Sequence, residues 1–233
     1  MATNGWRTVR FGDVVRNVDV NERNPLENGL DRYVGLEHLD PESLHIKRWG
    51  SVEDGTSFTR KFVAGQVLFG KRRAYQRKAA VAGFDGICSG DILVFEPNDD
   101  QLIAELLPFI VQSDGFFEHA LGTSAGSLSP RTKWKDLVAY EFALPPKDEQ
   151  RRIADFLWAA DQSVDEIERL HAQCKHMLDL MLGKLLSGAS DKFMQPLAAP
   201  RFQDVAPAAD DSRTSGSAPS LCCAADGAAA RPI

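Results

Sequence analysis

Hydrophobic and polar positions follow two patterns along the chain, and the change falls near residue 146. Before that point, short apolar runs are broken by Gly, Asp and Pro, which is typical of β-strands joined by turns. We therefore predict several short strands in the first part of the chain. The runs lie at 31–39, 65–71, 78–84 and 91–97, and one more strand is expected at 140–146.

Two helices are predicted in the same part of the chain. From Asp99 onward, apolar residues recur at helix spacing, with Asp99 or Asp100 as the cap and Pro108 as the position of a kink. A second short helix is expected over 113–121. A loop of small and turn-forming residues follows at 122–132. Short strands mixed with helices predict an α+β fold.

A long helix is predicted from Lys147 to Leu186. Its apolar positions recur in alternating steps of four and three, which is the 3.5-residue repeat of a coiled coil. This seam consists of Ile153, Leu157, Ala160, Val164, Ile167, His171, Cys174, Leu178, Met181 and Leu185. His171 is its one strongly polar member, either setting the register or merely tolerated. Such a helix would extend about 60 Å.

The seam requires a facing helix to fill its holes, and a second chain is the simplest source. The alternative is a helix that folds back on its own domain as an amphipathic cap. Beyond it, residues 188–233 are rich in Ala, Pro, Ser and Asp without periodicity, so we predict disorder and assign no function. The expected organisation is a mixed domain over 1–146, a coiled-coil helix over 147–187 and this tail.

Composition limits the class of protein. The 233 residues are 43% hydrophobic and 26% charged, which is enough to bury a core. The longest apolar run, 102–111, is too short to span a membrane and contains Glu105 and Pro108. The N-terminus has no apolar signal segment, so we expect a cytoplasmic protein.

Catalytic motifs are not found, and we expect a non-enzyme without a metal site. Phosphate-binding loops, dinucleotide fingerprints, zinc-protease and serine-hydrolase motifs are all absent from the sequence. Asp91 and Glu96 lack the lysine that a nuclease site needs, and we interpret them as strand-end and turn residues. Neither the histidines nor the cysteines show metal-ligand spacing; they are His38, His45, His119, His171, His176, Cys88, Cys174, Cys222 and Cys223.

Local charge differs from the net charge of −6. Seven cations lie between residues 60 and 84 without an acidic residue among them: Arg60, Lys61, Lys71, Arg72, Arg73, Arg77 and Lys78. Tyr75 lies inside this group, where its ring could pack on a sugar or base while the cations hold phosphate. A second cluster follows the loop that contains Ser127; it consists of Arg131, Lys133 and Lys135. A nucleic acid is the predicted ligand, and a solvated basic face is the alternative.

Five stretches, taken together and in this order, resemble specificity subunits of type I restriction-modification systems. They are WRTVRFGDV, GQVLFGKRRAYQRKAAVAGFDGICSGDILVF, TSAGSLSPRTKWKDL, FALPPKDEQRRIADFLWAAD and LMLGKLL. The most specific signal is SPRTKWKDL followed by LPPKDEQRRI at this spacing. The resemblance covers residues 5 to 187 and does not include the tail.

The resemblance implies a target-recognition domain that reads half of a split DNA sequence, followed by a helical spacer. A full subunit of this family carries two such units, whereas this sequence has one, so pairing of two copies, or with another half-subunit, is expected. The implied contacts with double-stranded DNA are Arg60, Lys61, Lys71, Arg72, Arg73, Tyr75, Arg77, Lys78, Ser127, Arg131 and Lys133. Pro145 and Pro146 would stiffen the joint, with Asp148 and Glu149 in the first helical turn.

The implied partners are a methyltransferase subunit and a restriction and translocase subunit. S-adenosylmethionine, ATP and Mg²⁺ are expected on those partners, and no cofactor is expected in this chain. Arg151, Arg152 and Trp158 could dock the methyltransferase, although Trp158 could equally pack under the DNA reader. Two alternatives remain: a coiled-coil protein that modulates another specificity subunit, and a free-standing DNA-binding regulator.

Overall fold

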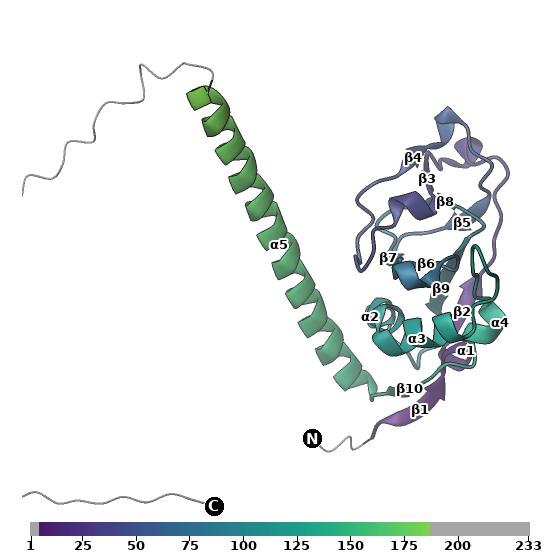
Figure 1. The fold of residues 1–233 in the computed structure, drawn as a ribbon. Coiled ribbons are helices and arrows are strands. Elements are labelled where there is room, and N and C mark those ends of the chain that lie inside the picture. Colours follow the sequence, from purple (N-terminus) through teal and green to yellow (C-terminus); the bar gives the residue numbers. More distant parts are fainter. Residues whose placement is uncertain (1–4, 187–233) are drawn as a thin grey trace, which may run out of the picture. The chain divides into compact units, whose positions relative to one another are not determined.

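The computed structural model describes residues 5–186, so the predicted tail lies outside the described residues. Ten short strands occur in this part of the chain (Figure 1). They are β1 (Arg7–Arg10), β2 (Val15–Val18), β3 (Arg32–Val34), β4 (Gly50–Ser51), β5 (Arg60–Phe62), β6 (Val67–Gly70), β7 (Ala79–Val81), β8 (Gly86–Cys88), β9 (Ile92–Pro97) and β10 (Glu141–Leu144).

Helices fill the gaps between strands and follow the last one. The α-helices are α1 (Phe11–Val14), α2 (Leu107–Gln112), α3 (Asp114–Gly122), α4 (Trp134–Leu137) and α5 (Lys147–Leu186). Short 3-10 turns are η1 (Leu26–Asn28), η2 (Leu36–His38), η3 (Val52–Asp54) and η4 (Ala74–Gln76). The α+β fold with a long helix after the last strand is therefore confirmed.

The strands form three sheets. The order is β2-β9-β6-β7 in one four-stranded sheet and β4-β3-β8-β5 in the other, while β1 pairs with β10. All pairings are antiparallel except β3 with β8. The pairing of β1 with β10 brings the start of the domain beside the strand that leads into α5, with Arg7 opposite Leu144.

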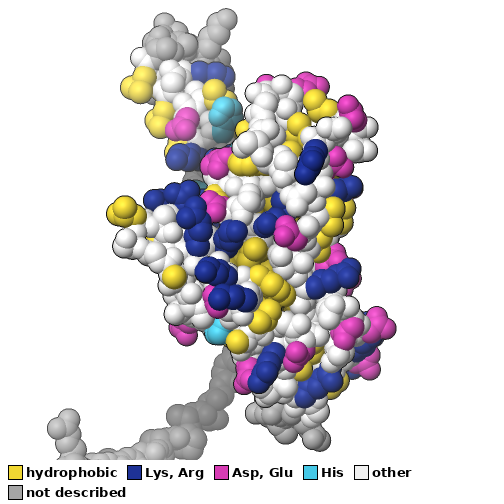
Figure 2. Space-filling model, turned by 90° about the vertical axis from the view of Figure 1, so that its right-hand side faces the viewer, with side chains coloured by type: hydrophobic (Ala, Val, Ile, Leu, Met, Phe, Trp, Pro, Cys, Tyr) yellow, Lys and Arg dark blue, Asp and Glu magenta, His cyan; other side chains and the backbone are white. Residues whose placement is uncertain are grey.

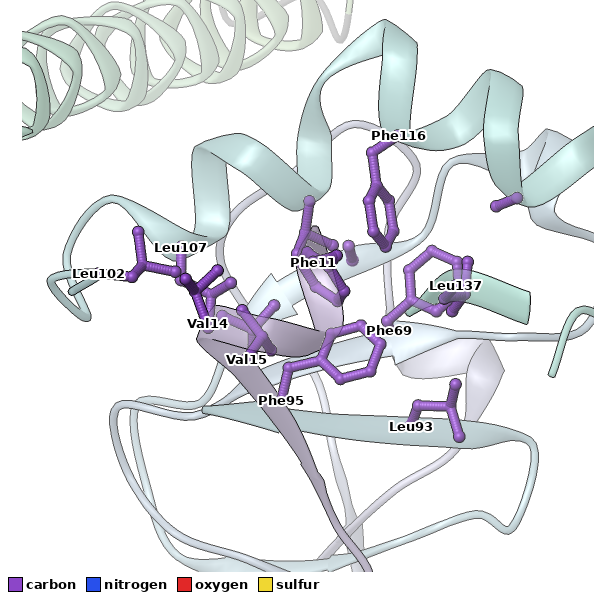
Figure 3. Packing of buried hydrophobic residues seen from close by; sticks show 14 of the residues in the cluster. Phe11, Val14, Val15, Phe69, Leu93, Phe95, Leu102, Leu107, Phe116 and Leu137 are labelled. Carbon is purple, nitrogen blue, oxygen red and sulfur yellow. The ribbon is translucent and has the colours of Figure 1, made fainter. Parts of the chain in front are cut away.

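An aromatic core lies between the first of these sheets and helices α2 and α3 (Figure 3). Phe11 is fully buried and contacts Phe95 and Phe116 at ring-centroid distances of 5.4 and 4.8 Å. Phe69 stacks on Phe95 at 5.7 Å. Contacts of this kind stabilise the core beyond the burial of apolar area alone.

A second core lies on the opposite face of the same sheet. Along β6, Val67 and Phe69 belong to the aromatic core, whereas Leu68 belongs to the second one. A sheet covered on both faces explains why these strands are continuous apolar runs rather than alternating ones. Cys88 is buried in the second core, and burial raises the pKa of its thiol to about 12, so it is not a reactive thiolate.

The region after Asp99 differs from the prediction of one helix kinked at Pro108. Residues 99–106 form turns, with the backbone N–H of Gln101 donating to the Asp99 carboxylate at 2.8 Å. Helix α2 then begins at Leu107, which places Pro108 in its first turn. The helix loses nothing there, because the first turn has no carbonyl partner for the missing N–H. The predicted kink was wrong, whereas the helix over 113–121 is confirmed, with Ser113 as its N-cap.

Helix α5 is anchored where it begins. Gln150 is buried, and its side chain accepts from the Ile103 N–H at 3.0 Å and donates to the carbonyls of Gln101 and Pro145 at 2.8 and 2.9 Å. Ala154 is buried one turn later. The first compact unit of the chain runs from Met1 to Lys175 and so includes most of α5.

Candidate nucleic-acid interface

The two basic clusters found in the sequence lie side by side. Arg72 and Arg131 face each other in an antiparallel backbone bridge. The bridge is flanked by hydrogen bonds from Arg73 N–H to the Pro130 carbonyl at 2.8 Å and from Thr132 N–H to the Lys71 carbonyl at 3.0 Å. The loop before Arg131 is therefore held against the turn after β6. We call residues 71–78 together with 123–133 the basic turn surface.

Asp91 organises the cations of this surface. Its carboxylate accepts from Arg131 Nε at 2.9 Å and Nη2 at 3.4 Å, and Arg72 Nη1 lies 3.6 Å away. The hydrogen bond from Arg131 holds the pKa of Asp91 below its usual value, and the charges of Arg131, Arg72 and Lys71 act in the same direction. Asp91 therefore stays ionised and fixes two guanidinium groups at the start of β9.

Positive charge remains in excess at this place. Burial lowers the pKa of Lys71; the charges of Arg60 and Arg131 lower it as well, while Asp91 and Asp19 act in the opposite direction. Figure 2 shows Lys and Arg side chains gathered near the middle of one face of the molecule.

Tyr75 is displayed by a tight backbone turn. It lies in η4, whose flanking residues Arg73 and Arg77 both have left-handed backbone angles, with φ of 55° and 51°. Each costs roughly 1–2 kcal/mol for a residue with a Cβ. The ring of Tyr75 is 56% exposed as a result. Strain of this kind is found preferentially at functional sites.

Besides Arg72 and Arg131, three more of the predicted contact residues have partners within the domain. Arg77 contacts the Gln112 carbonyl at 3.0 Å and Asp114 at 2.9 Å, and its guanidinium lies 4.8 Å from the Phe117 ring centroid. Lys78 donates to the Leu36 carbonyl at 2.7 Å. Arg60 pairs with Asp19 at 3.0 Å and is 15% exposed. Arg77 and Lys78 thus link the turn to α2, α3 and η2, whereas the partner of Arg60 lies outside the turn.

The other predicted residues are open to a ligand to different degrees. Ser127 and Lys133 are exposed, and Lys61 is partly exposed on β5. Arg72 Nε donates to the Ser129 hydroxyl at 2.5 Å, which ties the loop to the turn. Arg73 Nε is buried and finds no acceptor within residues 5–186.

Helix α5 contacts the domain through one side. Trp158 donates from Nε1 to the Glu105 carbonyl at 3.0 Å, and its ring lies 5.0 Å from that of Phe109. Trp158 therefore packs under the domain, whereas Arg151 is exposed and pairs with Asp148 in the same helix. Trp6 adds a hydrogen bond to Glu149 at 2.9 Å. The first part of α5 thus does fold against its own domain.

Most seam residues on α5, from Ala160 onward, are exposed. Ile153 packs partly against the aromatic core and Leu157 is half-buried, but Val164 and Ile167 are 55% and 65% exposed. Ala160, His171 and Cys174 are exposed as well. In the part of α5 after Lys175, exposure is 57% for Leu178, 55% for Met181 and 56% for Leu185.

A hollow of about 570 Å³ lies beside the first turns of α5 and is lined by Pro146, Ile153, Phe156 and Leu157, among others. Phe156 is 73% exposed there. Apolar side chains exposed in such number are typical of a surface that binds another molecule.

Sequence reasoning found the two clusters but missed what joins them. Asp91 was interpreted as a strand-end residue, which its place before β9 bears out, yet its pairing with Arg72 and Arg131 carried no local signal. The contacts of His45 and Lys47 with α5 were also missed, because they link positions more than 110 residues apart.

These observations define a class: an α+β domain that presents a basic turn surface and continues into a long helix with an uncovered apolar seam. The family described as "Type I restriction modification DNA specificity domain" matches residues 4–175. The chain belongs to this family. Within residues 5–186, no helix is both long and apolar enough to cross a membrane.

Similar specificity subunits support the same assignment. The chain is 27% identical over 198 residues to the type I restriction enzyme EcoDI specificity subunit of Escherichia coli, covering 79% of this chain and 42% of that protein. Its fold is similar to the crystal structure of the HsdS subunit from Thermoanaerobacter tengcongensis, with 26% identity and a TM-score of 0.58 over 84% of this chain and 51% of that one.

The type I restriction-modification S subunit from M. genitalium shares the fold alone, at 15% identity and a TM-score of 0.55, over 78% of this chain and 46% of that one. The chain thus spans about half the length of the relatives it matches.

Proposed function

We propose that the chain reads one half of a split DNA sequence as the specificity component of a type I restriction-modification complex. The observation that carries this proposal is the basic turn surface, where two clusters distant in sequence meet at the Arg72–Arg131 bridge and Tyr75 is exposed. DNA binding needs cations for the phosphates and a side chain that reaches bases, and this surface supplies both.

The side chains divide into two roles. Lys71, Arg72, Arg131 and Lys133, with the Ser127 hydroxyl, hold the phosphate backbone, and Tyr75 contacts a sugar or base edge. Lys61 extends the surface along β5. Arg73 precedes Tyr75 in the turn, and we assign Arg60, Arg77 and Lys78 to supporting roles because they contact Asp19, Asp114 and the Leu36 carbonyl rather than the Asp91 cluster.

The chain associates with a second copy through the seam of α5. The support is the uncovered set of apolar side chains at heptad spacing, which one helix cannot bury by itself. Two identical readers related by a two-fold axis recognise a near-palindrome, interrupted by base pairs that neither reader touches. The length of α5 then sets the distance between the half-sites.

The assembled specificity component recruits a methyltransferase subunit and a restriction subunit. This chain supplies sequence recognition and not catalysis in that scheme. S-adenosylmethionine, ATP and Mg²⁺ then belong to the partners. The exposed hollow beside Phe156 and the cations Arg151 and Arg152 are available for that docking.

A second candidate function also rests on the uncovered seam. A chain with one reader could pair with a different specificity subunit and redirect it, and the exposed side chains of α5 suit that partner equally. The recognised sequence would then be asymmetric, because the two halves would be read by different domains.

Methylation mapping of host DNA by single-molecule sequencing, with and without the gene, tests the proposed function. A split, near-palindromic methylated motif that disappears with the gene supports both the reader and the pairing of two copies. A split but asymmetric motif supports pairing with another subunit. If no motif depends on the gene while the methyltransferase remains active, the proposed function is wrong.

A further inference from the structure

A cluster of three metal-ligating side chains lies where α5 meets the domain. His45, Asp161 and Asp165 each offer one ligand atom, and these atoms lie within 4.8 Å of one another. Asp161 and Asp165 are four residues apart on α5, so they lie on one face of the helix. His45 approaches from the segment after η2, which is remote from both in sequence.

His45 has two carboxylates beside one ring nitrogen, and an ordinary ion pair would need only one. Its Nε2 lies 2.6 Å from Asp161 Oδ2 and 3.2 Å from Asp165 Oδ2. A ring nitrogen carries at most one hydrogen, so it serves one carboxylate well and the other poorly. A cation placed between the three atoms would satisfy all of them.

Lys47 orients the second carboxylate. It donates to Asp165 Oδ1 at 3.2 Å and to Glu168 at 3.3 Å, which leaves Asp165 Oδ2 turned toward His45. An outer partner that fixes a ligating carboxylate is a usual feature of metal sites.

The space around the cluster suits a metal with solvent ligands. A hollow of about 380 Å³ is lined by the three residues and by Asp40, Glu42 and Glu168. Ligands of a tetrahedral zinc ion lie roughly 3.4 Å apart when the bonds are about 2.1 Å long. The His45–Asp161 pair at 2.6 Å would have to open by less than 1 Å, which partly exposed side chains can do by rotation.

We propose that His45, Asp161 and Asp165 bind a divalent transition-metal ion that ties α5 to the DNA-reading domain. One imidazole with two carboxylates favours borderline ions such as Zn²⁺ or Co²⁺ over Ca²⁺ and Mg²⁺, which prefer oxygen alone. Bound metal adds a cross-link beyond the Trp158 contact and restricts the angle between helix and domain. The proposal does not depend on which DNA sequence is read.

The test is calorimetric titration of the intact protein with Zn²⁺, followed by Co²⁺ absorption spectroscopy. The starting protein carries His171→Ala and His176→Ala, so that exposed imidazoles elsewhere on α5 do not contribute. We expect one ion per chain and affinity at least tenfold weaker in Asp161→Asn and in Asp165→Asn. Glu166→Gln is the matched control, because Glu166 lies on the same helix but pairs with Arg169. This variant should bind Zn²⁺ as tightly as the starting protein.

Both asparagine variants keep the shape of the side chain, and their melting temperatures without metal report whether they fold. The proposal is overturned if the starting protein binds no stoichiometric Zn²⁺. It is equally overturned if folded Asp161→Asn and Asp165→Asn bind as tightly as Glu166→Gln.

Discussion

Arg72 and Arg131 lie opposite each other in an antiparallel bridge, and both guanidinium groups contact the carboxylate of Asp91. Like charges so close repel each other, and a carboxylate between them offsets this repulsion. Asp91 therefore permits a dense positive surface without making it neutral. The relationship explains how a chain with a net charge of −6 presents a locally basic surface.

Removal of the Asp91 charge should destabilise the domain in a pH-dependent way. Asp91 has a lowered pKa in the folded state, so its contribution is present above the unfolded pKa and is lost as pH falls through the folded pKa. We expect Asp91→Asn to cost on the order of 1 kcal/mol at pH 7. The difference from the parent should shrink below pH 4, as measured by urea unfolding at several pH values. A difference that grows in acid would contradict this role.

Tyr75 should matter for recognition and little for folding. Its ring is 56% exposed, so Tyr75→Ala removes few internal contacts. In the assembled complex we expect roughly tenfold weaker binding to the recognised duplex, and a much smaller loss on a scrambled duplex. Tyr75→Phe keeps the ring and should bind nearly as the parent does. Equal losses on both duplexes would show that Tyr75 does not read sequence.

The seam on α5 can be tested at two positions whose side chains make little contact with the domain. Val164→Asp with Ile167→Asp should abolish self-association without unfolding the monomer, because both side chains are more than half exposed. Gln162→Asp adds a charge away from the seam and is the control. Analytical ultracentrifugation gives the result, and a dimer that persists in the double variant would place the interface elsewhere.

The start of α5 depends on one buried amide. Gln150→Leu leaves the Ile103 N–H and the carbonyls of Gln101 and Pro145 without their side-chain partner. We expect a loss of roughly 3 kcal/mol in the free energy of unfolding. Gln162→Leu, at an exposed position of the same helix, should change it little. Equal stability of the two variants would mean that the Gln150 bonds are replaced by water.

Much of the fold could be predicted because its signals are local. The apolar runs became β3, β6, β7 and β9, and the step pattern after Pro146 became α5 with the predicted bounds. The helix expected from Asp99 failed for a local reason too: Pro108 can begin a helix as well as kink one. The pattern could not distinguish the two, because apolar side chains of the turns at 99–106 are also buried.

The candidate site could be predicted only as a set of charges. The sequence identified both basic clusters, but Arg60, Arg77 and Lys78 have partners that lie far away in the chain, at Asp19, Asp114 and Leu36. A cation that braces a turn and one that faces solvent look the same in a sequence. Pairing of β1 with β10, and of Arg72 with Arg131, depends on the folded topology alone.

The most direct test of the central claim is the salt dependence of DNA binding by the complex assembled with its partner subunits. Replacing Arg72 and Lys133 by glutamine removes two cations of the basic turn surface. We predict weaker binding and a log–log salt slope shallower by about 1.8 for each half-site, since each phosphate contact contributes about 0.9. Arg10→Gln with Arg16→Gln removes two exposed cations elsewhere and should leave the slope unchanged. An unchanged slope in the Arg72 and Lys133 variant would contradict the assignment of this surface to DNA.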